Sequence, residues 1–182
     1  VAFPWLDARQ FSVAGVPTRA LRLSYVGELG WELHMPMADL DTAYAAILEA
    51  GAKRVYITAR KHDACVGAAE ELSQYGECIA IPGDVATSDG LQNLASELMS
   101  REDHIDVLVN NAGAGWGAPF GQFPEHGWDK TMTVNTKSPF FLTQALAPLL
   151  KANARADNTA SIINIGSIAG MVGHAVDNFS YA

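Results

Sequence analysis

Two hydroxyl side chains late in the sequence are suited to proton transfer at a carbonyl group. Ser167 follows the apolar stretch Ser161–Ile165, and Tyr181 comes fourteen residues after Ser167. A carbonyl that accepts a hydride develops oxyanion character, so a hydroxyl donor must be aimed at it and must finally give up a proton. Taken singly, such a Ser or Tyr is usually structural, and its meaning depends on the rest of the chain.

Three further motifs accompany these hydroxyls. Asn110-Asn111-Ala112-Gly113 follows an apolar run, where an Asn side chain can tie neighbouring strands together and a small Ala-Gly pair lets a cofactor approach the backbone. Asp84-Val85 follows the preceding apolar run. Asn135 lies inside a long helical pattern, although Asn is a poor helix former. Five such elements in one order are hard to attribute to chance.

The elements that must position these residues alternate between apolar runs and helical patterns, which is typical of β-α-β units and a parallel sheet. The predicted strands are Arg54–Thr58, Cys78–Ile81, Ile105–Asn110 and Ser161–Ile165, and the predicted helices are His62–Tyr75, Gly90–Ser100 and Trp128–Lys151. The first fifty residues differ in character. There the patterns predict half-buried strands at Arg19–Tyr25 and Trp31–Met35 and a helix at Leu40–Ala50.

Composition excludes several classes of protein. The 182 residues are 49% hydrophobic, enough for one core with or without a small appendage. A net charge of -8 with scattered Lys and Arg argues against nucleic-acid binding. The two cysteines and five histidines have no metal-ligand spacing, so no metal site is expected. With no membrane span and no signal peptide in the sequence, a cytoplasmic protein is expected.

The five elements together resemble the short-chain dehydrogenase/reductase family, over about Ala52 to Ala182. Within the family, Gly127–Lys130 and Lys137–Gln144 are most similar to 3-oxoacyl-carrier-protein reductases of the rhamnolipid-synthesis type. The resemblance implies an α/β fold with a partial Rossmann-type doubly wound parallel sheet. It also implies a small-molecule ketone or a 3-oxoacyl thioester as the substrate.

The resemblance assigns roles to the conspicuous residues. Tyr181 is the acid, Ser167 holds the carbonyl, and Asn135 belongs to a water relay that positions a Lys four residues after the Tyr. A free Tyr has a pKa near ~10 and needs such a cation to act near neutrality. Since the sequence given ends at Ala182, we expect this chain to be inactive. By the same resemblance, the Asn110–Gly113 motif binds the cofactor, Asp84 contacts the adenine and Val85 flanks it.

The end of the second family strand indicates which cofactor is used. It reads Thr58-Ala59-Arg60-Lys61, with no acid to bind a ribose 2′-hydroxyl, so NADP(H) is favoured with Arg60 on the 2′-phosphate. Alternatively, Arg60 and Lys61 only solvate a loop. Where the family has a Gly-rich phosphate turn, this chain has Met35-Pro36-Met37-Ala38. Since side chains and a proline there obstruct the phosphates, we expect cofactor binding to be weakened or lost.

The first part of the chain resembles another family. Arg22–Leu33, preceded by Phe3–Leu6, is similar to the folate-binding aminomethyltransferase domain of the glycine cleavage T-protein and of sarcosine and dimethylglycine dehydrogenases. The resemblance makes Glu28 a pterin-contacting carboxylate, although a solvated turn is the alternative. The implied organisation is an α+β aminomethyltransferase-like fragment at 1–51 joined to an incomplete Rossmann-type domain at 52–182. Such a chimera is a carbonyl reductase, a folate-dependent aminomethyl-transfer remnant, or a non-catalytic fragment.

Three expectations concern the surroundings of the site. Strand Trp31–Met35 and helix Leu40–Ala50 could mimic the missing first β-α-β unit next to the strand at Arg54. Trp116, Phe120 and Phe123 line a substrate mouth or, equally, cap the core. The family resemblance also implies a homo-oligomer through helix 128–151, marked by Phe140 and Leu146 if they are exposed.

Overall fold

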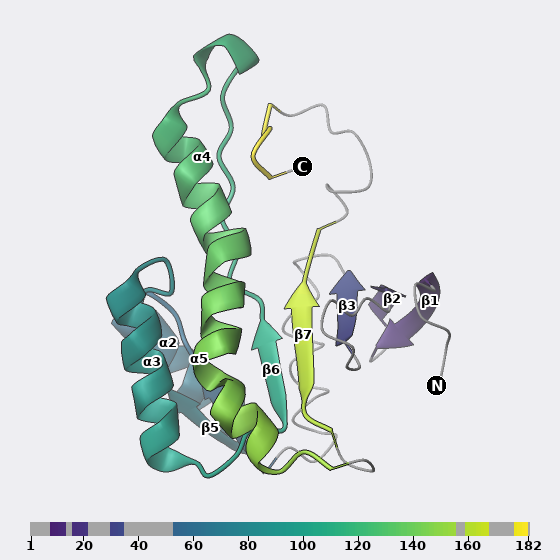
Figure 1. The fold of residues 1–182 in the computed structure, drawn as a ribbon, viewed down its shortest axis with the longest axis vertical. Coiled ribbons are helices and arrows are strands. Elements are labelled where there is room, and N and C mark those ends of the chain that lie inside the picture. Colours follow the sequence, from purple (N-terminus) through teal and green to yellow (C-terminus); the bar gives the residue numbers. More distant parts are fainter. Residues whose placement is uncertain are drawn as a thin grey trace.

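The computed structural model describes residues 8–13, 16–21, 30–34, 53–155, 159–167 and 177–181 (Figure 1). Its strands are β1 Ala8–Val13, β2 Val16–Leu21, β3 Gly30–His34, β4 Arg54–Ile57, β5 Glu77–Ala80, β6 Val107–Asn110 and β7 Ser161–Ile165. Its helices are α2 His62–Leu72, α3 Ser88–Arg101, the 3-10 turn η2 Phe120–Gln122, α4 Glu125–Met132, the π-helical turn η3 Thr133–Lys137 and α5 Ser138–Ala152. The predicted helix Leu40–Ala50 lies outside the described residues.

The strands form two sheets in the described part of the chain. β4 pairs with β5 in parallel, and the other sheet has the order β1-β2-β3-β7-β6. In this second sheet β3, β7 and β6 are parallel, whereas β1, β2 and β3 form an antiparallel meander. The α/β fold and the four strands predicted from Arg54 onward are confirmed. β1 was not predicted.

The placement of β3 corrects one expectation. A strand was predicted at Trp31–Met35 and is found at Gly30–His34, but it pairs with β7, with Trp31 opposite Ile163. Within the described residues, β4 pairs only with β5, so β3 does not stand beside β4 as the first strand of a β-α-β unit. The prediction was wrong because β3 already has β2 as an antiparallel partner, and its other edge pairs with the outer edge of β7.

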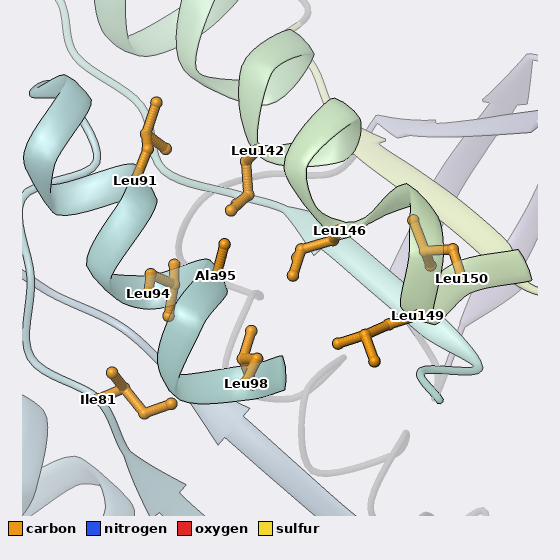
Figure 2. Packing of buried hydrophobic residues seen from close by; sticks show 9 residues of the cluster. All are labelled: Ile81, Leu91, Leu94, Ala95, Leu98, Leu142, Leu146, Leu149 and Leu150. Carbon is orange, nitrogen blue, oxygen red and sulfur yellow. The ribbon is translucent and has the colours of Figure 1, made fainter. Parts of the chain in front are cut away.

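The main core lies between helices α3 and α5 and the sheets. Figure 2 shows the leucines of the two helices pointing toward one another, with Leu91, Leu94 and Leu98 on α3 facing Leu142 and Leu146 on α5. The spacing of these leucines puts them on one face of each helix. Partly buried side chains of both sheets pack against this cluster, namely Tyr56, Leu108 and Ile162. One layer of helices therefore covers β4 as well as β6 and β7.

The long helix predicted at Trp128–Lys151 is interrupted by a π-helical turn. α4 begins after Pro124, and residues 133–137 form the π turn before α5. The Ser138 hydroxyl lies 2.7 Å from the Val85 carbonyl oxygen and 2.8 Å from the Thr133 carbonyl oxygen. Such turns are often found at functional sites, and this one contains Asn135.

The two residues proposed to mark an interface on this helix differ in exposure. Leu146 is 0% exposed because it packs into the core against α3, so it does not meet the condition of exposure set for an interface residue. Phe140 is 64% exposed and meets the condition set for it. No helix in the described part of the chain is both long and apolar enough to cross a membrane.

A charged cluster lies at the amino ends of β4 and β5. Arg54 donates to Glu77 at 2.8 Å and to Glu102 at 2.7 Å, and the Tyr56 hydroxyl donates to Glu102 at 2.7 Å. The hydrogen bonds from Arg54 and then Tyr56 lower the pKa of Glu102. Burial and the bond to Glu102 raise the pKa of Tyr56. This cluster joins the end of α3 to the sheet, away from the carboxyl ends of the strands.

Candidate active site

The residues singled out from the sequence follow the carboxyl ends of parallel strands. Arg60 comes after β4, Asp84 after β5, Asn111 after β6 and Ser167 after β7. β4 and β5 are parallel in one sheet, and β6 and β7 are parallel in the other, so the carboxyl ends within each pair lie at the same edge. Folds built from β-α-β units bind ligands at such edges. The topology therefore puts Arg60 and Asp84 at one edge and Asn111 and Ser167 at another, although the members of each pair are widely separated in the sequence.

Asp84 shapes the turn that leads into α3. Its carboxylate accepts a hydrogen bond from the Ala86 amide at 3.0 Å, and its carbonyl oxygen accepts one from the Thr87 hydroxyl at 3.0 Å. Thr87 also caps α3 by accepting from the Gly90 amide at 3.0 Å. A Cβ on Gly90 would collide with the Asp84 carbonyl, so the turn requires glycine there. The next residue, Val85, is fixed through its carbonyl oxygen by Ser138.

Asn110 performs the tying role expected of an Asn at this position. It is 9% exposed, and its amide nitrogen donates to the Asn164 side chain at 2.9 Å and lies 3.4 Å from the Thr143 hydroxyl. Asn110 thereby joins β6 to β7 and to α5. Asn111, Ala112 and Gly113 follow as exposed residues. A Cβ added to Gly113 would lie 3.9 Å from the Asn111 carbonyl oxygen and 4.0 Å from the Asn135 side-chain oxygen, which are ordinary van der Waals contacts.

Asn135 holds the loop that continues from this motif. Its side-chain oxygen accepts from the Ala114 amide at 2.8 Å, and its side-chain nitrogen donates to the Ala114 carbonyl at 2.9 Å. The side chain is half-buried in the π turn. Asn135 therefore fixes both backbone polar groups of Ala114, a positioning contact that the sequence did not reveal. Its place in a water relay stays a prediction.

Tyr181 lies against the same loop. Its amide donates to the Asn178 carbonyl at 2.8 Å, which closes a turn, and a Cβ on Gly115 would be 3.9 Å from the Tyr181 ring. The Ala118 amide donates to the Asp177 carbonyl at 2.9 Å. Figure 1 shows the short segment 177–181 beside the loop that rises from β6. Tyr181 is thus placed next to the loop that Asn135 fixes, while Ser167 is half-buried at the end of the adjacent strand β7.

Two aromatic residues of the loop after Asn111 differ in their surroundings, since Trp116 is packed against a helix and Phe120 is exposed. Trp116 packs on α4, with its ring 4.8 Å from the His126 ring and the Lys130 ammonium 5.5 Å from its centroid. A Cβ on Gly127 would lie 2.6 Å from the Trp116 ring, so this packing depends on glycine. Phe120 is 82% exposed and hence does not cap the core.

The edge at β4 and β5 has features that fit a dinucleotide. Arg60 is exposed just beyond β4, as a ligand for a phosphate must be. The Thr58 hydroxyl oxygen is buried and has no hydrogen-bond partner among the described residues, and it would be 3.8 Å from a Cβ on Gly83. A buried hydroxyl without a partner is costly unless a ligand or water satisfies it. Sequence reasoning missed Thr58, because it reads as one more residue of an apolar strand.

Comparison with known proteins identifies the family. Residues 41–181 match the short chain dehydrogenase family. The chain belongs to that family. Residues 1–60 match the GCVT N-terminal domain, so the resemblance of the first part is also confirmed. The two matched stretches overlap over residues 41–60, which include the predicted junction near Gly51.

Individual relatives agree with this assignment. The chain is 45% identical over 135 residues to the rhamnolipids biosynthesis 3-oxoacyl-[acyl-carrier-protein] reductase of Pseudomonas aeruginosa, covering 74% of this chain and 52% of that protein. It is 50% identical over 58 residues to human mitochondrial sarcosine dehydrogenase, covering 32% of this chain and 6% of that protein. The chain therefore spans about half the length of the reductase and a small part of the sarcosine dehydrogenase.

Solved structures show the same fold. The Pseudomonas aeruginosa RhlG/NADP active-site complex is 43% identical with a TM-score of 0.72, covering 76% of this chain and 54% of that chain. A metagenomic short-chain oxidoreductase in complex with NADP is 33% identical with a TM-score of 0.65, covering 76% of this chain and 62% of that chain. A nicotinamide cofactor is therefore common among the structural relatives.

Proposed function

We propose that residues 53–181 carry the catalytic and cofactor-facing part of an NADP(H)-dependent carbonyl reductase whose substrate is a 3-oxoacyl thioester or a similar small ketone. The observation that supports this most is the position of Arg60, Asp84, Asn111 and Ser167, each following the carboxyl end of a parallel strand. The printed name of the 45% identical relative supports the 3-oxoacyl substrate.

In this proposal Ser167 and Tyr181 bind and protonate the carbonyl oxygen of the substrate. The Ser167 hydroxyl holds the substrate carbonyl, and the Tyr181 hydroxyl donates the proton that the developing oxyanion requires. NADPH, when bound, supplies the hydride. Asn135 contributes by fixing Ala114, because the neighbouring Gly115 lies beside Tyr181: a Cβ built on Gly115 would be 3.9 Å from the Tyr181 ring.

The cofactor is assigned to the carboxyl ends of β4 and β5 in one sheet and of β6 in the other. Arg60 binds the 2′-phosphate, Asp84 and Val85 lie by the adenine, and the exposed backbone of Asn111-Ala112-Gly113 lets the cofactor approach. The NADP complexes among the relatives support this choice of cofactor. The proposed affinity is low because Met35–Ala38, the stretch that corresponds in the sequence to the family's phosphate turn, has no glycine. In addition, among the described strands, β3, which precedes this stretch, pairs with β7 and not with β4 or β6. Residues 35–38 themselves lie outside the described ones.

The assignment of Arg60 is tested by substituting Arg60→Asp and titrating NADPH and NADH by nucleotide fluorescence. A charge-assisted phosphate contact of about 1.5 to 3 kcal/mol predicts a loss of about 10- to 100-fold in NADPH affinity, with NADH binding retained. Lys151→Asp at the far end of α5 is the charge-matched control and should change neither affinity. An unchanged nucleotide preference refutes the role of Arg60, and no binding of either nucleotide refutes the cofactor proposal.

The proposed homo-oligomer uses the exposed apolar side chains of α4 and α5. Trp128, Phe140 and Phe141 are 46%, 64% and 44% exposed. Phe140→Asp should shift the sedimentation coefficient to that of the monomer, and a wild-type chain that already sediments as a monomer contradicts the interface.

We place the activity in the cytoplasm, a reducing compartment that suits the free, buried Cys65 and Cys78.

A second candidate function is folate-dependent aminomethyl transfer, favoured by the match of residues 1–60 to the GCVT N-terminal domain. The carboxylate assigned to the pterin, Glu28, lies outside the described residues. Tetrahydrofolate should raise the melting temperature of the chain if this part retains a pocket. No shift with either tetrahydrofolate or NADPH would favour the third possibility, a non-catalytic fragment.

A further inference from the structure

The loop between β6 and α4 contains an apolar and uncharged stretch. Residues 117–124 read Gly-Ala-Pro-Phe-Gly-Gln-Phe-Pro, with two phenylalanines and no acid or base. Loops usually expose polar residues, so two large aromatic side chains in such a short uncharged loop need a structural or functional reason.

The structure brings these two rings to a third. The Phe120 and Phe179 ring centroids are 5.3 Å apart at 74°, and those of Phe123 and Phe179 are 5.8 Å apart at 76°. These edge-to-face contacts are favourable, and they join the loop to the segment that ends at Tyr181. We call Phe120, Phe123 and Phe179 the aromatic cluster.

The aromatic cluster is only partly covered. Phe120 is 82% exposed and Phe179 is 41% exposed, although each has an aromatic neighbour. Their contacts with one another leave ring surface open to solvent, and the loop around them offers no charged side chain. An apolar ligand gains from covering this surface, whereas a phosphate or carboxylate would find no cation there.

The cluster also lies next to the catalytic group. Phe179 is two residues before Tyr181, in the turn closed by the Tyr181 amide and the Asn178 carbonyl. The Ala118 amide donates to the Asp177 carbonyl just before that turn, and a Cβ on Gly115 would be 3.9 Å from the Tyr181 ring. A substrate with its carbonyl at Tyr181 would therefore have its flanking chain close to the aromatic cluster.

We propose that the aromatic cluster binds the hydrocarbon chain of an acyl substrate whose carbonyl is reduced at Tyr181. This inference rests on the proposed reductase function for the identity of the ligand. It makes the cluster a specificity element, since Phe120 and Phe179 select long acyl chains over short ones. The Phe140–Phe141 pair on α5, with ring centroids 5.2 Å apart, has similar exposed rings but is a helix surface and plays no such part.

The test measures the affinity of straight-chain, saturated acyl N-acetylcysteamine thioesters of increasing length by calorimetry. These saturated thioesters lack the 3-oxo group that the proposed reaction reduces, so their binding can be measured without turnover. Burial of each methylene is expected to lower the Kd by about two- to four-fold over the first additions. Phe120→Ser should weaken this dependence and Phe120→Ser with Phe179→Ser should abolish it. Tyr75→Ser, which replaces an aromatic residue that is 45% exposed outside both the site and the proposed interface, is the control and should leave it intact.

The outcomes separate this inference from the proposed function. A Kd that does not change with chain length in the wild-type chain overturns the inference, as does the same dependence in the Phe120→Ser and wild-type chains. Since Phe120 is mostly exposed, its substitution is not expected to unfold the protein, and a melting curve checks this. Length-dependent acyl binding that needs Phe120, in a chain that fails to bind NADPH, contradicts the reductase yet supports the acyl subsite.

Discussion

The contact between Asn135 and Ala114 gives the sharpest prediction about how the site is held. The Asn135 side chain satisfies both backbone polar groups of Ala114, at 2.8 and 2.9 Å, from a half-buried position in the π turn. Asn135→Ala removes two hydrogen bonds, each worth about 1 kcal/mol net, and leaves a donor and an acceptor to be satisfied by water. Because the site is only half-buried, water can reach them, and we expect a loss of about 2 to 3 kcal/mol in the free energy of unfolding.

Urea denaturation measures the global effect, and amide hydrogen exchange locates it. If the 2 kcal/mol falls on local opening, the Ala114 amide should exchange about 30-fold faster in Asn135→Ala. Asn135→Asp keeps an oxygen that accepts from this amide but turns the other oxygen toward the Ala114 carbonyl. This variant should therefore keep more amide protection while losing stability. Thr136→Ala, an exposed neighbour in the same turn, is the control and should change little.

Two results would refute this reasoning. The first is a change in unfolding free energy within about 0.5 kcal/mol for Asn135→Ala, which is the range of ordinary surface substitutions. The second is unchanged exchange of the Ala114 amide in that variant. Either result would mean that the loop next to Tyr181 is held by other contacts, such as the packing of Trp116 on α4.

Two more predictions concern the fold around the site. Leu146→Ala should lower the unfolding free energy by about 2 to 5 kcal/mol in urea denaturation, because Leu146 is fully buried between α5 and α3; a cost equal to that of exposed Phe140→Ala would contradict this packing. Hydrogen bonds from Arg54 and Tyr56 lower the folded-state pKa of Glu102 below its ordinary 4.5, which means that the ionised carboxylate stabilises the folded chain. This contribution to the free energy of unfolding is present at neutral pH and is lost as the pH falls through the lowered pKa. Glu102→Gln should flatten the acid-side fall of the melting temperature, and an unchanged pH profile would show that the bonds contribute nothing.

The sequence predicted the part of the fold that local patterns determine. The strands from Arg54 onward are short apolar runs bounded by polar or small residues, and all four appear within two residues of their predicted positions. The positions of Arg60, Asp84 and Ser167 followed from these strands, because each residue comes shortly after a parallel strand. Their roles stay predictions. The sequence left the exposure of Leu146 open, because helical periodicity identifies an apolar face but does not reveal whether α3 or another molecule covers it.

The pairing of strands that are far apart in the chain could not be predicted from the sequence. Strand β3 has an apolar pattern that suits either edge of a parallel sheet, and only the structure shows that it pairs with β7. The backbone contacts of Asn135 with Ala114 and the meeting of Phe179 with Phe120 also join segments far apart in the chain. No local spacing encodes such contacts, since they depend on how the loop after β6 folds over α4.

The five-stranded sheet combines strands from the parts of the chain that match two different families. The antiparallel meander β1-β2-β3 falls within the part that matches the GCVT N-terminal domain, and β4 to β7 fall within the short chain dehydrogenase match. β3 therefore pairs in parallel with β7, a strand of the other family. A single DNA read across the codons for Ala50 and Gly51 would establish whether one gene encodes both parts.

The central claim is that the carboxyl ends of β4, β5 and β6 form the cofactor edge of this chain. Nuclear magnetic resonance titration with NADPH tests it most directly, because chemical shifts report even weak binding residue by residue. We predict shifts in the amides of Arg60, Asp84 and Gly113, with no change at Arg54 and Glu77 on the opposite edge. Shifts confined to the Arg54 edge, or no shifts at saturating NADPH, would contradict the account.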